Sequence, residues 1–87
     1  MAISREALIG HYLEETQENI QAIEKGILKL KKDPENEEIL NGIQRALHTV
    51  KGSSRMLKFS GMEHIAHAME NLLKGVKEQR YPLSPPF

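Results

Sequence analysis

A long run of apolar residues at helical spacing near the start of the chain limits the fold more than any other feature. The apolar positions recur at intervals of four and three residues over about six turns, with one polar interruption at Thr16. This period predicts an amphipathic helix with one face against a core. Asp33-Pro34 ends it, because the residue before a proline is pushed out of the helical region. The stripe consists of Ile9, Leu13, Thr16, Ile20, Ile23, Ile27 and Leu30.

Two helices are predicted before the break in pattern at Lys58. The first covers about residues 4–32 and begins at Ser4, whose hydroxyl can cap the first helical turn. The second covers about residues 35–57, with Asp33 as its cap and Pro34 suited to the first helical position. The apolar side of this second helix consists of Ile39, Ile43, Ala46, Val50 and Leu57.

A third helix is predicted over about residues 61–79. Ser60, with Glu63 three residues later, has the pattern of a capping box. The apolar residues of this segment lie within about 100° of one another around a helix axis, which predicts one core face. That face consists of Met62, Ile65, Ala66, Met69, Leu72, Leu73 and Val76. The predicted fold class is therefore all-α.

The end of the chain has the pattern of an entrance to another helix, because Ser84 precedes Pro85. Residues 1–87 are therefore expected to be a single domain that stops at the start of its fourth helix. That helix is expected to be missing or supplied by a partner chain. Three amphipathic helices leave part of the first apolar stripe exposed, so a homodimer through the incomplete bundle is also expected.

Composition narrows the classes of function. Twelve basic and twelve acidic residues cancel, so the chain lacks the positive charge that draws proteins to nucleic acid or to anionic membranes, and we expect neither partner. The absence of cysteine excludes disulfides, thiol catalysis and zinc-thiolate sites. No stretch approaches the roughly 18 apolar residues of a membrane span, and no signal-peptide pattern opens the chain. A cytoplasmic domain is expected.

One histidine of the second helix, His48, lies on the face opposite the apolar side. A lone histidine on a helix face is usually a solvated polar residue. Its neighbours on that face, however, combine cations with a residue that has no side chain. They are Gln44, Arg45, Lys51, Gly52 and Arg55.

The third helix carries His67 and Glu70 one turn apart on the flank of its core stripe. If the second and third helices pack antiparallel, this flank approaches His48. A carboxylate there could accept a hydrogen bond from one imidazole nitrogen and leave the other as a nucleophile. Lys51 would supply positive charge for an incoming phosphoryl group, and Gly52 would let a partner approach closely.

Other interpretations stay open at this point. His67 and Glu70 could form an ordinary pair on a helix surface. The chain could be a purely structural helical interaction or oligomerisation module with no phosphoryl chemistry. A metal site among Glu63, His64, His67 and Glu70 is not expected, since no further ligands accompany them.

The segment from Arg45 to Ser54, with the later His67-Ala68-Met69-Glu70, resembles histidine phosphotransfer (HPt) domains. The closest resemblance is to the N-terminal phosphotransfer domain of the chemotaxis histidine kinase CheA. The shared pattern is Arg-Ala-x-His-[Ser/Thr]-x-Lys-Gly, followed by Gly-Phe and then His-x-x-Glu. The chain departs from it at Lys58, which stands where the family commonly has the glycine before Phe59.

The resemblance implies an up-and-down antiparallel helical bundle in which His48 is phosphorylated. It implies that Glu70 orients the imidazole, with His67 and Lys51 in the same hydrogen-bond network, and that Gly52 gives partners access. Gln44, Arg45 and Arg55 are expected to take part in docking. An ATP-binding kinase domain would phosphorylate His48 and a response-regulator receiver would take the group, so no catalysis and no bound cofactor are expected of this domain alone. The parent protein is expected to be a histidine kinase.

Overall fold

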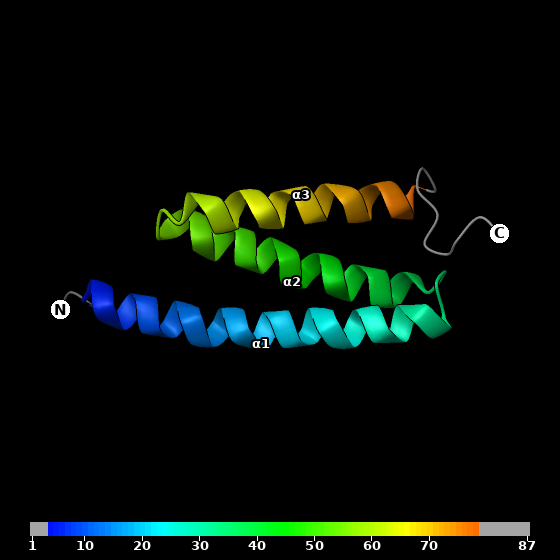
Figure 1. Ribbon diagram of the computed structural model, residues 1–87, viewed down its shortest axis with the longest axis horizontal. Coiled ribbons are helices and arrows are strands. Elements are labelled where there is room, and N and C mark those ends of the chain that lie inside the picture. The colour runs from blue at the N-terminus through cyan, green and yellow to red at the C-terminus, as the bar shows by residue number, and fades with distance from the viewer. Residues whose placement is uncertain (1–3, 79–87) are drawn as a thin grey trace.

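The computed structural model describes residues 4–78, which form three helices that run up and down beside one another (Figure 1). Helix α1 spans Arg5–Lys32, α2 spans Glu37–Met56 and α3 spans Ser60–Lys77. Helix α2 lies in the middle, and no pair of described Cα atoms from α1 and α3 lies within 8 Å. The predicted all-α antiparallel arrangement is confirmed. The helix start expected at Ser84 and Pro85 lies outside the described residues.

The core lies toward the end of the bundle where α1 turns into α2. Aliphatic side chains of α1 and α2 are buried there, and two partly buried residues of α3 pack against them. Removal of this apolar surface from water is the main stabilising contribution to the fold. The cluster consists of Ile23, Leu30, Leu40, Ile43, Ala46 and Leu47, with Ile39, Leu73 and Val76 against it.

Helix α2 buries a wider arc than the sequence pattern predicted. Ile43, Ala46 and Val50 are buried as expected, whereas Leu40 and Leu47 are also buried and lay outside the predicted face. The reason is that α2 packs against a helix on each side, so one narrow stripe cannot cover its contacts.

Two predicted core faces are wrong in part. On α1, the predicted stripe residues Leu13, Ile20 and Ile27 are exposed, while Tyr12, which the stripe omitted, is buried. On α3, only Ala66 of the predicted face is fully buried. No other described element covers the far sides of α1 and α3. The expected homodimer through this surface stays a prediction. The residues of the predicted apolar face of α3 that are exposed are Met62, Ile65, Met69 and Leu72.

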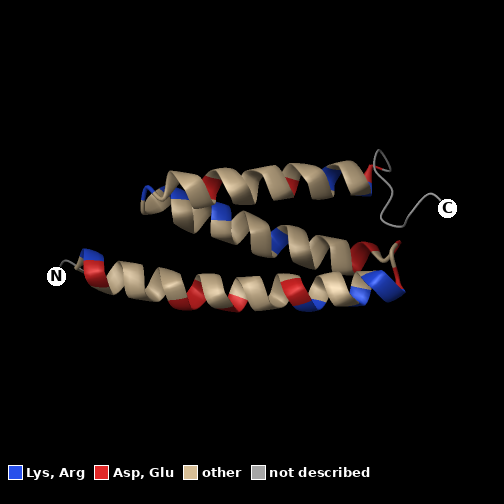
Figure 2. Ribbon diagram, viewed as in Figure 1, with Lys and Arg blue, Asp and Glu red and all other residues tan. Residues whose placement is uncertain are grey.

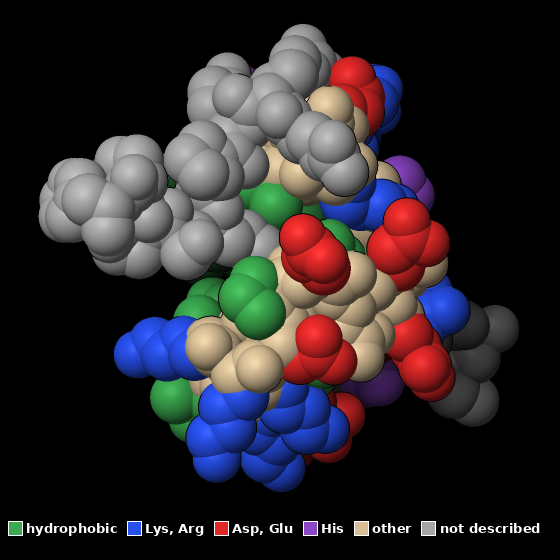
Figure 3. Space-filling view, turned by 90° about the vertical axis from the view of Figure 1, so that its right-hand side faces the viewer, with side chains coloured by type: hydrophobic (Ala, Val, Ile, Leu, Met, Phe, Trp, Pro, Cys, Tyr) green, Lys and Arg blue, Asp and Glu red, His purple; other side chains and the backbone are tan. Residues whose placement is uncertain are grey.

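The turn between α1 and α2 differs from the predicted one. Asn36, rather than Asp33, is the N-cap of α2, and its side-chain oxygen accepts a hydrogen bond from the Ile39 N–H. Asp33 instead caps the C-terminus of α1. The lysines that end α1 and the glutamates that begin α2 gather at this end of the molecule (Figures 2 and 3), where each charge complements its helix dipole.

The turn between α2 and α3 explains why the predicted capping box does not form. Lys58 has a positive φ of 62°, the N–H of Phe59 donates to the Ser54 carbonyl and the N–H of Lys58 donates to the Arg55 carbonyl. These bonds form a Schellman motif, in which glycine usually takes the left-handed position. Helix α3 starts directly afterwards, so the Glu63 N–H donates to the Phe59 carbonyl and Ser60 is its first residue.

The same turn is anchored to α1 by aromatic and polar contacts. The ring of Phe59 lies 5.2 Å from that of Tyr12, measured between centroids. The Tyr12 hydroxyl and the Ser54 hydroxyl form a buried hydrogen bond of 2.8 Å. These contacts hold the N-terminal half of α1 against α2, where aliphatic core residues are few.

The closest approach of α1 to α2 occurs at Gly26. A Cβ atom at this position would lie 2.6 Å from Cγ1 of Ile43, which is itself buried in the core. Only glycine lets the two helix backbones come this near without displacing Ile43.

Gly26→Ala is therefore expected to lower the free energy of unfolding by about 1–2 kcal/mol, because overpacking outweighs the gain in helix propensity. The matched control is Gly10→Ala, on the same helix with nothing within 4 Å of the added Cβ. It should raise stability by about 0.5–1 kcal/mol. Urea denaturation measures both, and equal effects of the two substitutions would contradict the close approach at Gly26.

Candidate functional site

Helix α2 holds His48 on the side away from its buried residues. Leu47 and Val50 are the buried residues that precede and follow His48 on α2, and each is 4% exposed. The His48 side chain is 69% exposed. The helical period thus fixes the histidine on the surface while the backbone beneath it is locked by packing.

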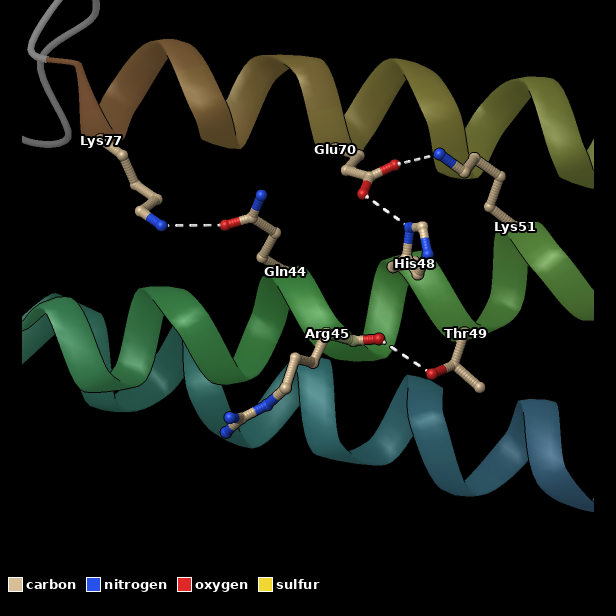
Figure 4. A network of polar contacts seen from close by, with 7 residues as sticks. All are labelled: Gln44, Arg45, His48, Thr49, Lys51, Glu70 and Lys77. Atoms are coloured by element: carbon tan, nitrogen blue, oxygen red, sulfur yellow. Dashed lines mark hydrogen bonds and ion pairs between the residues drawn. The ribbon is translucent and has the colours of Figure 1, made fainter.

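A carboxylate from α3 meets this histidine, as the sequence predicted for an antiparallel pair of helices (Figure 4). Oε2 of Glu70 lies 3.2 Å from Nδ1 of His48, and Oε1 of the same carboxylate lies 2.8 Å from Nζ of Lys51. Both oxygens of Glu70 are therefore engaged by groups from α2. The side chain of Glu70 is only 15% exposed, so water competes weakly for these bonds.

The environment of Glu70 favours its ionised form. Partial burial alone would raise the pKa of the Glu70 carboxyl, but the hydrogen bonds from Lys51 and His48 and the positive charge of Lys51 outweigh it, so that its pKa lies below the ordinary value. At neutral pH the site therefore contains a carboxylate that accepts bonds from both partners.

The contact defines the chemistry of the imidazole. A carboxylate can only accept a hydrogen bond, so the nitrogen that faces it, Nδ1, carries the proton. The neutral ring then has its lone pair on Nε2, which makes no hydrogen bond with the described residues. The arrangement yields an exposed nitrogen nucleophile backed by a partly buried negative charge.

Three of the polar contacts between α2 and α3 repeat at heptad intervals. On α3, Glu63, Glu70 and Lys77 lie seven residues apart, and they meet Arg55, His48 and Asn41, which lie seven residues apart on α2 in the opposite direction. This regular register, which is typical of antiparallel helices, is what brings Glu70 to His48.

A shallow groove of about 530 Å³ extends from His48 toward the N-terminus of α2. Each of its lining residues carries a polar side chain, and all but Glu70 belong to α2. The lining residues are Asn41, Gln44, Arg45, His48, Thr49 and Glu70.

The other predicted site residues fall into two groups. Gln44 and Arg45 line the groove, and Gly52 and Arg55 lie on the same face beyond His48, where nothing stands within 4 Å of a Cβ built on Gly52. His67 is exposed and makes no hydrogen bond or ion pair among residues 4–78. The prediction that it joins the network with His48 is therefore not met in this structure, because His67 lies one turn before Glu70 and about 60° around the helix.

Three residues near the site were not predicted. Nζ of Lys77 donates to Asn41 Oδ1 and, at 3.0 Å, to Gln44 Oε1, while the Thr49 hydroxyl donates to the Arg45 carbonyl. The signal in the sequence was available, since Asn41 lies seven residues before His48 and Lys77 seven residues after Glu70.

Residues 4–78 contain neither a membrane-spanning helix nor a metal-binding cluster. No described helix is long and apolar enough to cross a membrane. The described His, Asp and Glu side chains form no group of three that could hold a metal ion, so the metal-site interpretation gains no support.

A comparison with family models identifies the chain. The model for the Hpt domain matches residues 7–87. The chain belongs to the Hpt domain family. The resemblance to histidine phosphotransfer domains drawn from the motif around His48 is therefore confirmed, and the interpretation as a purely structural module gains no support.

Relatives of this Hpt domain include CheA proteins. The chain is 39% identical over 73 residues to chemotaxis protein CheA of Listeria monocytogenes and 32% identical over 66 residues to that of Bacillus subtilis, with 84% and 76% of the chain covered. It spans only 12% and 10% of the length of these two proteins. The solved CheA phosphotransferase domain from Thermotoga maritima matches with a TM-score of 0.86 at 34% identity, covering 95% of this chain and 78% of that one.

The lowered pKa of Glu70 predicts a pH dependence that Glu70→Gln should remove. A carboxyl whose pKa is lower in the folded state than its ordinary 4.5 stabilises the fold above that pH, and this stabilisation is lost as the pH falls through the folded-state pKa. The gap in unfolding free energy between wild type and Glu70→Gln should therefore be constant from pH 7 to about 5 and close at lower pH.

Chemical denaturation at a series of pH values measures this gap. Glu24→Gln, at an exposed position of α1, serves as the control and should follow the wild-type profile. A gap that widens below pH 4.5 would contradict the assignment.

Proposed function

We propose that His48 accepts a phosphoryl group from an ATP-dependent kinase domain and passes it to an aspartate of a response-regulator receiver. The observation that carries the proposal is the contact between Glu70 and Nδ1 of His48, which directs Nε2 away from the carboxylate on a side chain that is 69% exposed. Membership of the Hpt family and the likeness to CheA phosphotransfer domains support the same assignment.

The transfer step follows from this geometry. Nε2 of His48 attacks the γ-phosphorus of ATP, so that a P–N bond forms while the bond to the ADP oxygen breaks. The ring still carries its proton on Nδ1 and therefore becomes positively charged. The Glu70 carboxylate, 3.2 Å from that nitrogen, stabilises the positive charge as it develops.

The same contact serves the second transfer. An aspartate oxygen of the receiver attacks the phosphorus, the P–N bond breaks and its electron pair returns to Nε2. The protonated ring is a better leaving group than a neutral one, and Glu70 retains the proton on Nδ1 throughout. Lys51 holds the second oxygen of Glu70 at 2.8 Å and thereby keeps the carboxylate in position.

The reaction is divided between the Hpt domain and a separate kinase domain. The Hpt domain supplies the nucleophile and its orienting carboxylate, while a separate kinase domain holds ATP and this domain binds no cofactor. Both partners must reach the same nitrogen, which fits the exposed face around Gly52 and the cations Arg45 and Arg55. The reaction takes place in the cytoplasm, within chemotaxis-type two-component signalling.

Phosphorylation of purified variants tests the proposal. With the kinase core of a CheA-type protein and [γ-³²P]ATP, the wild-type domain should incorporate acid-labile label and His48→Gln should incorporate none. Glu70→Ala should slow labelling by at least about 10-fold, because the developing imidazolium loses its carboxylate. Its circular dichroism should stay helical.

His11→Gln is the matched control, since His11 is exposed on α1 away from the site. It should label at the wild-type rate. Equal labelling of His48→Gln and wild type would overturn the proposal.

A further inference from the structure

In the last of these three contacts between α2 and α3, the positive charge comes from α3 and not from α2. In the first two, α3 supplies a carboxylate, Glu63 or Glu70, to cations or the histidine of α2. In the third, α3 supplies a cation, Lys77, and α2 supplies the side-chain amides of Asn41 and Gln44. Figure 4 shows the contact of Lys77 with Gln44.

This reversal fixes the orientation of two amides. A lysine ammonium has three donors and no acceptor, so each amide must turn its oxygen toward Lys77. The NH₂ groups of Asn41 and Gln44 are then directed away from Lys77, and neither makes a hydrogen bond among the described residues. Both residues line the groove beside His48.

The groove is consequently rich in donors and positive charge. Besides the two amides it contains the guanidinium of Arg45, which has no side-chain partner in residues 4–78. Its single carboxylate, Glu70, is already bonded to Lys51 and His48. The groove and the residues bonded to it thus hold three cations against one anion, although the whole chain has no net charge.

We infer that Lys77 is a positioning residue that sets Asn41 and Gln44 as hydrogen-bond donors for a carboxylate-rich surface of the receiver domain. The inference rests on the proposed function, in which the receiver brings a carboxylate acceptor to His48. Carboxylate oxygens accept but cannot donate, so they match a groove whose free groups are NH₂ and guanidinium. Lys77 itself acts through the amides and does not line the groove.

Substitutions at position 77 distinguish an effect on the orientation of the Asn41 and Gln44 amides from the simple loss of a contact. Lys77→Arg keeps a donor-only side chain and should bind the receiver as the wild type does. Lys77→Met removes the bias and should weaken binding about 3-fold. Lys77→Glu would accept from both amides, turn their oxygens into the groove and weaken binding about 10-fold or more. A merely structural contact predicts instead that Lys77→Glu binds no worse than Lys77→Met, because its carboxylate can bond the amides.

Calorimetric titration of the unphosphorylated domain with a purified receiver domain measures these affinities, in low and in about 0.5 M salt. Lys74→Glu, an exposed charge reversal one turn earlier on α3, is the control for net charge. Salt screens charge effects at the surface, so the excess loss in Lys77→Glu over Lys77→Met should persist in 0.5 M salt while the effect of Lys74→Glu disappears. Gln44→Met, which removes a donor without changing charge, should match Lys77→Met.

The outcomes distinguish this inference from the proposed function. Equal affinities of Lys77→Glu and Lys77→Met, or no binding of the wild-type domain to the receiver, would overturn the inference even if His48 is phosphorylated. The hydrolysis rate of phosphorylated His48 can be measured in the same variants without receiver. A change in this rate as large as the change in receiver affinity would also overturn the inference, since the donors would then serve the phosphoryl group. Absence of label on His48, with the binding order intact, would overturn the proposed function alone.

Discussion

The antiparallel register of α2 against α3 is the constraint on which the site depends. Seven-residue steps on the two helices bring Glu63, Glu70 and Lys77 opposite groups of α2 in turn. A shift of one residue would rotate Glu70 about 100° away from His48 and remove the carboxylate from the imidazole. The nucleophile and its orienting group are each held by a separate helix, so the packing of those helices is part of the chemistry.

One local feature maintains this register, and a second holds α2 from the side of α1. The Schellman turn after α2, with Lys58 in the left-handed region, reverses the chain within a few residues and starts α3 without a side-chain cap. At the other side of α2, Gly26 permits α1 to approach Ile43 closely. Helix α2 is thereby clamped from both sides, while its third side, with His48, remains open to partners.

The sequence predicted the helices and the central pair of the site well. Helical periodicity alone places His48 on the side of α2 opposite its core. On α3, the same periodicity places Glu70, the predicted orienting residue, one turn after His67 on the flank of the apolar face. The cap of α2 was misplaced because Asn36 competes with Asp33 for the same role. The capping box at Ser60 failed because α3 begins at Ser60 directly after the Schellman turn, so the N–H of Glu63 donates to the Phe59 carbonyl. Such competition between local motifs is decided by tertiary context.

The burial of α1 and α3 and the role of Lys77 could not be obtained in the same way. Periodicity predicts which face of a helix is apolar, but it does not predict whether another element covers that face, so Leu13 and Ile65 remain exposed. The seven-residue spacing of Lys77 from Glu70 is visible in the sequence, but it indicates a contact with Gln44 only once the register of α2 against α3 is known. The motif around His48 thus predicts the reaction from the sequence alone, whereas the residues of the surrounding groove can be identified only from the three-dimensional arrangement.

The most direct test of the account is the position of the phosphoryl group on the imidazole. Nitrogen-15 and phosphorus-31 NMR of the phosphorylated domain, labelled at histidine, distinguishes the two ring nitrogens by their couplings to phosphorus. The bond between Glu70 and Nδ1 predicts that phosphorus is attached to Nε2 of His48, with a proton retained on Nδ1. Attachment to Nδ1 would contradict the account, because the nitrogen assigned to Glu70 would then be the nucleophile.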